Sequence, residues 1–155
     1  MLVDFETAIL NRLTEKGIPN VQGWSGKPDE LFIKPKTFPA ARYVFEGLDF
    51  LSIGAFSYTT VIKCSIILFF HTFKDKGQGA YPLIETILNA LSGFYADGFY
   101  LEPKKIELLF HESIDFAYQI QFEAVGKYVV EDEPESLTTK ITTYESQELS
   151  TEVSV

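Results

Sequence analysis

The chain has 155 residues, of which 46% are hydrophobic and 15% aromatic, enough for one domain with a core of its own. Its formal net charge of −9 disfavours a basic surface of the kind that binds nucleic acid. One cysteine excludes an internal disulfide framework, and no apolar run reaches the ~20 residues of a membrane helix.

The first expected element is a helix that starts near the N-terminus. Asp4 is a suitable N-cap, and apolar residues recur at helical spacing as far as Leu13. Gly17 and Pro19 then supply a stop signal. The acidic start lacks the basic residues of a secretory signal, so we expect synthesis and folding in a cytoplasm.

A long irregular loop is expected over residues 19–40, which hold four prolines. Such a loop either has a function or merely wraps the sheet. Trp24 is the only tryptophan, and it is either an interface anchor or a plug at the end of the core. Phe32, in a short apolar stretch of the same loop, is a second candidate interface residue.

Two strands are expected next, over residues 41–50 and 58–73, with a turn region between Gly47 and Gly54. The second strand is apolar on both faces at its far end. Because an exposed edge of that kind would aggregate, this strand is expected to be central in the sheet. Cys64, in the middle of it, is expected to be buried and unreactive.

A polar link over residues 74–79 leads into a second helix, expected over residues 80–96 with one wide apolar stripe. Lys74 and Lys76 in the link could hold an anion beside the helix N-terminus. No phosphate-loop pattern supports this, so a plain connection is favoured, in which the lysines could also meet an acidic neighbour.

Two alternating strands follow, the first ending near Phe110 and the second running from Phe116 to Ala124, with a hairpin connection between them. The resulting order is α-β-β-α-β-β. We therefore predict an α+β fold, a mostly antiparallel four-stranded sheet packed by two helices.

The negative charge is concentrated at the C-terminal end. Residues 131–155 carry seven acids and one lysine, a net of −6, so residues 1–130 contribute only −3 of the −9. We predict a single α+β domain over residues 1–130 and an acidic, Ser/Thr-rich tail over residues 131–155. The tail has too few apolar residues to fold alone. Either a neighbouring subunit accepts it as an added strand, or it is a solvated segment.

The sequence contains no recognisable catalytic, metal or cofactor motif. The two histidines, His71 and His111, lack companion ligands at suitable spacing. Carboxylate pairs such as Glu102 and Glu107 have no signal that places them in a pocket. We therefore expect no enzyme activity and no cofactor.

Three segments occur in an order typical of one known family: residues 79–85 (Gly-Ala-Tyr-Pro-Leu-Ile-Glu), 101–103 (Leu-Glu-Pro) and 117–123 (Ala-Tyr-Gln-Ile-Gln-Phe-Glu). In this pattern residues 1–130 resemble the Mu-like phage small tail protein family. That family is related in architecture to the tail terminator, or tail completion, proteins of long-tailed phages. The acidic tail is not part of the pattern.

The resemblance implies a homo-oligomer, a hexameric ring on the end of a tail tube that stops tube growth and presents a surface to the neck or head-completion protein. Its partners would be the tail tube protein, the sheath where a tail has one, and the neck or head-completion protein. Its location would be the virion tail, after assembly in the host cytoplasm. No membrane and no sequence-specific nucleic acid is implied.

Two other classes of function stay open. One is a different structural role in a phage or phage-like particle, such as a neck connector or baseplate adaptor. The other is a small ligand-binding domain or enzyme that uses the concave face of the sheet. The latter predicts a pocket with converging polar groups.

Overall fold

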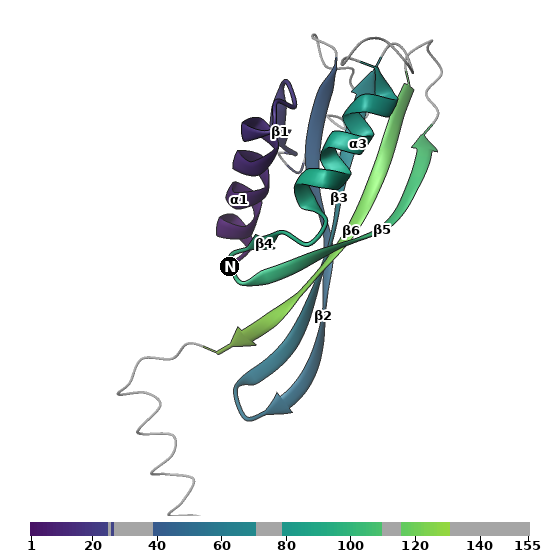
Figure 1. The fold of residues 1–155 in the computed structure, drawn as a ribbon. Coiled ribbons are helices and arrows are strands. Elements are labelled where there is room, and N and C mark those ends of the chain that lie inside the picture. Colours follow the sequence, from purple (N-terminus) through teal and green to yellow (C-terminus); the bar gives the residue numbers. More distant parts are fainter. Residues whose placement is uncertain (25, 27–38, 71–78, 110–115, 131–155) are drawn as a thin grey trace, which may run out of the picture.

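The computed structural model describes residues 1–24, 26, 39–70, 79–109 and 116–130. Its helices and strands are α1 (Leu2–Glu15), β1 (Val21–Gly23), β2 (Ala40–Gly54), β3 (Ser57–Phe70), α3 (Ala80–Leu91), β4 (Tyr95–Ala96), β5 (Phe99–Leu109) and β6 (Phe116–Val129). The strands form one sheet in the order β1-β2-β3-β6-β5-β4. β1 is parallel to β2 and the other pairs are antiparallel. Both helices lie on one face of this sheet (Figure 1).

The predicted four-stranded, mostly antiparallel sheet with the order α-β-β-α-β-β is therefore wrong. The sheet is a six-stranded mixed sheet, because β1 adds a parallel partner to β2 and β4 pairs with the start of β5. Strands of three and two residues are too short to show the alternation by which a strand is recognised in a sequence.

The main core lies between the helices and the sheet. Phe5, Ile9 and Leu13 line the buried side of α1. β3 is central, as predicted, and its even-numbered residues from Ile62 to Phe70 face the helices. The largest fully buried side chains are Phe5, Phe70, Phe122, Ile9, Leu13, Ile62, Ile66, Leu68, Ile87, Leu91, Leu101 and Ile120. This burial of apolar surface holds both helices against the sheet.

The opposite face of the sheet carries a second, smaller apolar cluster at one end. It consists of Ala40, Val44, Ile67, Phe69 and Ala117, with Trp24 and Leu109 packed against it. β3 is thus apolar on both faces at this end, which accounts for its position in the middle of the sheet.

Both helices have ends that differ from the predicted ones. α1 starts at Leu2 with Met1 as the N-cap, so Asp4 lies in its first turn, where a negative charge still favours the helix dipole. α3 ends at Leu91 rather than residue 96, because Gly93 follows with a φ of +77° and β4 begins at Tyr95.

β2 and β3 form a hairpin that extends beyond the helices (Figure 1). The predicted turn region between Gly47 and Gly54 is wrong, since β2 continues to Gly54 and its hairpin partner β3 starts at Ser57. Gly47 instead follows a bulge in β2, where the register with β3 shifts between Phe45 and Gly47. We call the outer half of this hairpin, residues 47–60, the arm.

Candidate interaction surface

The arm exposes large apolar side chains. Leu51 is 66% exposed, Phe50 53%, Ile53 50% and Phe56 46%. Phe50, Leu51 and Ile53 lie on β2, and Phe56 lies in the turn before β3. This part of the hairpin extends beyond the part of the sheet that the helices cover (Figure 1). Successive residues of a strand point to opposite faces, so Phe50 is exposed on the helix side and Leu51 on the other face. Large apolar side chains exposed together at one end of a globular protein indicate a surface at which another protein is bound.

Three aromatic rings gather on the helix side of the arm. Phe50 contacts Tyr58 and Tyr128 with ring centroids 5.9 Å and 6.1 Å apart. Its register partner is the buried Thr60. The rings hold one another in place and remain half open, which suits an aromatic anchor at an interface.

A groove of about 560 Å³ adjoins these rings at Tyr128. Its wall comes from the start of α1, the turn between β4 and β5, and the end of β6: Met1, Asp4, Asp97, Phe99, Lys127, Tyr128 and Val129. The groove therefore extends the exposed surface of the arm toward the helices.

Both edges of the sheet are open over most of their length in the part that the structure describes. β1 pairs with residues 41–43 of β2 alone, which leaves the outer edge of β2 from Val44 to Gly54 without a strand. β4 pairs only with Phe99 and Tyr100 of β5, so residues 102–109 form the other open edge. Unpaired backbone groups at an edge are a template for a further strand.

The two open edges differ in chemistry. The β5 edge is broken by Pro103 and a bulge before Lys105, and it carries charged side chains, devices that discourage pairing with another strand. The β2 edge carries the apolar residues Phe50 and Leu51. The β2 edge is therefore the better template for an added strand.

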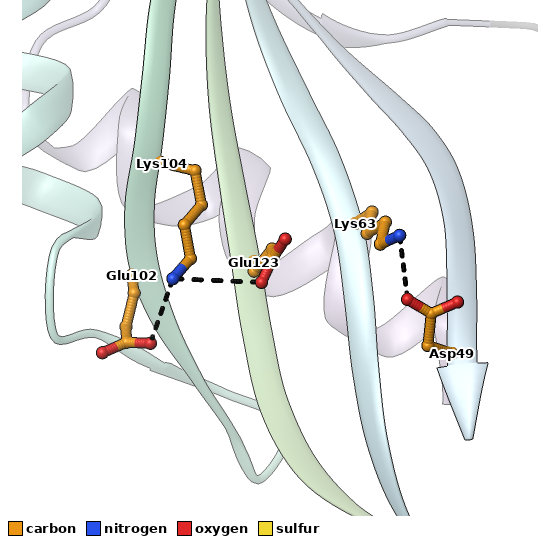
Figure 2. A network of polar contacts seen from close by, with 5 residues as sticks. All are labelled: Asp49, Lys63, Glu102, Lys104 and Glu123. Atoms are coloured by element: carbon orange, nitrogen blue, oxygen red, sulfur yellow. Dashed lines mark ion pairs between the residues drawn. The ribbon is translucent and has the colours of Figure 1, made fainter. Parts of the chain in front are cut away.

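The face away from the helices is charged in its middle part. Figure 2 shows acids and lysines from β2, β3, β6 and β5 on this face. Lys63 Nζ lies 2.8 Å from Asp49, and Lys104 Nζ lies 3.8 Å from Glu102 and 3.9 Å from Glu123.

Hydrogen bonds and a further ion pair extend this charged face. Lys105 contacts Glu107 at 2.7 Å, and Gln119 donates to Glu46 and Ser65. The hydrogen bond to Asp49 raises the pKa of Lys63. Because these lysines already have carboxylate partners, the face is a poor site for nucleic-acid phosphates.

Of the four residues predicted as interface candidates, the structure describes only Trp24. Trp24 is half-buried against the small apolar cluster, and its backbone N–H donates to Tyr43 O at 2.9 Å. Phe32, Lys74 and Lys76 lie outside the described residues. The interaction surface at the arm was not among the predictions, although residues 50–56 of the sequence include several large apolar residues.

The described residues include no group of three or more His, Cys, Asp and Glu side chains that could hold a metal ion. Burial raises the pKa of the Cys64 thiol to about 12, so it stays protonated at neutral pH. Burial likewise raises the pKa of Tyr43. His71 and His111 lie outside the described part of the chain. None of the described helices has the length and apolarity needed to span a membrane.

Neither a model of a known protein family nor a curated protein sequence matches this chain. Among solved structures, a chain in the virion of a native gene transfer agent particle is similar at a TM-score of 0.55 and 12% identity. The match covers 81% of this chain and 96% of that chain. At this identity the likeness shows a shared fold.

Proposed function

We propose that this chain is a structural protein of a phage or phage-like particle, a tail terminator that caps the tail tube as a ring and joins it to the neck. The observation that carries the proposal is the arm, an exposed apolar hairpin beside an open sheet edge. Such a surface suits lasting contacts with other proteins. The fold shared with a chain of a gene transfer agent virion supports the same class of protein.

The reason for proposing a ring rather than a two-fold dimer is the resemblance to tail terminators. In a head-to-tail contact the β2 side of one copy meets another surface of the next copy, and such contacts close into a ring when the rotation is right. A hexamer would leave every arm covered. The ring would bind the tail tube protein on one side and a neck or head-completion protein on the other, in the virion.

The test is native mass spectrometry over a range of protein concentrations, with electron microscopy of the particles formed. We expect a discrete ring of six copies for the unmodified chain. The double substitution L51D/I53D should shift the mass toward the monomer, because two charges would be placed where apolar contacts form.

Tyr81→Asp is the matched control, since Tyr81 is 45% exposed and lies in the first turn of α3, which starts at the end of the sheet far from the arm (Figure 1). It should leave the ring intact. A monomer at every concentration, with or without assembled tail tubes, would contradict the ring. Binding to the neck side without binding to tubes would favour the alternative role of a neck connector.

A further inference from the structure

The outer edge of β2 contains a regular stretch between two irregularities. The register with β3 shifts between Phe45 and Gly47 and again between Ser52 and Gly54. Residues 47–52 between them pair with β3 on one side only, within the described chain. This stretch therefore offers room for an added strand of about six residues.

The two faces of this stretch differ, since Phe50 lies on the helix side whereas Asp49 and Leu51 lie on the other face. Phe50 points to the helix side, where it contacts Tyr58 and Tyr128. Asp49 points to the charged face, where it contacts Lys63 (Figure 2). A strand that fits here must carry apolar residues on one face and a cation on the other.

Residues 137–144 (Leu-Thr-Thr-Lys-Ile-Thr-Thr-Tyr) have this pattern. In an extended strand, alternate side chains share a face, so Leu137 and Ile141 lie on one side and Lys140 on the other. The apolar pair would cover Phe50, and Lys140, the only cation of residues 131–155, would approach Asp49.

The position of this segment in the chain brings it within reach of an arm, and in the proposed ring that arm belongs to the next copy. Val130 N–H donates to Phe56 O at 2.8 Å, so the chain leaves the fold at the tip of the arm. Residues 131–136 hold four acids and Pro134, a composition that repels itself and extends. Six extended residues reach about 20 Å.

We propose that residues 137–144 of one copy bind as an added strand along residues 47–52 of the next copy. The inference rests on the proposed function, because the ring supplies the neighbour. The segment ties adjacent copies together, covers Phe50 and closes the open β2 edge.

The test is hydrogen–deuterium exchange of the full chain at several protein concentrations. The reporters are those backbone amides of residues 47–52 that make no hydrogen bond to β3. We expect their exchange to slow about tenfold or more as concentration rises. Ile141→Asp should abolish this protection, and Gln147→Asp, which lies beyond the proposed strand, should retain it. Unchanged protection of core amides such as that of Ile66 shows that each variant is folded.

Of the four other outcomes, the first three overturn the inference, whereas the fourth supports the added strand and contradicts the ring. Protection that does not depend on concentration would mean that the segment binds its own arm. Concentration-dependent protection that survives Ile141→Asp would mean that another surface covers the edge, and the ring would stand without the added strand. A ring without protected edge amides would have the same meaning. Protection that Ile141→Asp abolishes in an assembly other than a ring would support the strand and contradict the ring.

Discussion

At the scale of single residues, the sheet interior depends on side chains that have no access to water. Phe122 on β6 is 1% exposed and lies on the face toward the helices, opposite Cys64 and Pro103 in the ladders. An aspartate here would be a buried charge without a partner. We expect Phe122→Asp to lower the free energy of unfolding by about 4 kcal/mol or more, measured by urea denaturation.

The matched control is Val125→Asp on the same strand. Val125 is 40% exposed and faces away from the helices, so its replacement should leave the protein folded. If Phe122→Asp unfolded in urea at the same midpoint as Val125→Asp, the assignment of the two faces of β6 would be wrong.

The thiol of Cys64 is expected to make the free energy of unfolding depend on pH in the alkaline range. Burial raises its pKa from 9.0 to about 12, so the unfolded chain releases the proton at a lower pH than the native protein does. Stability contributed by the protonated thiol is full below pH 9.0 and is lost as the pH rises toward 12. The loss is at most about 1.4 kcal/mol per pH unit.

Urea unfolding at about pH 8 and about pH 10 checks this dependence. Tyr43 has its pKa raised in the same direction, so the comparison must be made with Cys64→Ala. We expect the difference in unfolding free energy between the two pH values to be smaller in Cys64→Ala than in the unmodified chain. An equal difference in both proteins would assign the pH dependence to Tyr43 and the other groups that titrate above pH 9.

At the scale of elements, the turn between β4 and β5 packs so closely on β6 that position 126 requires glycine. A Cβ on Gly126 would lie 2.6 Å from the Phe99 ring and 2.9 Å from Gly98 O. Because Phe99 is 3% exposed, its ring has little room to move. We expect Gly126→Ala to cost about 1–3 kcal/mol of unfolding free energy, measured by urea denaturation.

Gly54 at the end of β2 offers the matched control. A Cβ there would have no atom within 4 Å, so Gly54→Ala should be neutral or slightly stabilising. A neutral Gly126→Ala would show that the β4–β5 turn does not pack on β6 as described.

The periodic spacing of apolar residues predicted the long helices and strands. The errors in the predicted fold lie where a single residue such as a glycine was the only sequence signal, or where there was none. The alternation of β6 and the stripe of α3 identify their buried faces. Gly47 looked like a turn residue because glycine favours both turns and bulges, and only pairing with β3 distinguishes them. Pro103 lies inside β5, where an open edge tolerates the missing N–H.

The arm was missed for a related reason. Phe50 ended the predicted strand over residues 41–50, and the turn predicted between Gly47 and Gly54 left Leu51 and Ile53 without a strand. Their exposure follows from tertiary structure: the helices end before the sheet does (Figure 1). Trp24 is half-buried at the small apolar cluster, and its role at an interface stays a prediction.

At the scale of the whole molecule, folding and assembly are expected to depend on different parts of the chain. The main apolar cluster of the described residues is built from side chains that precede residue 131, so removing residues 131–155 leaves each of these side chains in place. We expect this deletion to leave the unfolding free energy of the monomer unchanged to within about 0.5 kcal/mol, measured at low protein concentration. The same deletion should weaken the ring, because the strand proposed to join adjacent copies is lost.

Measuring both quantities on one protein separates the two roles of the chain. A loss of cooperative melting at low concentration would place residues 131–155 in the core of the monomer and contradict the division at residue 130. An unchanged melt with an unchanged ring would mean that assembly relies on the arm and the sheet edges alone. Because the segment carries a net charge of −6, the deletion should be compared at several salt concentrations, which separates a lost strand contact from relieved charge repulsion.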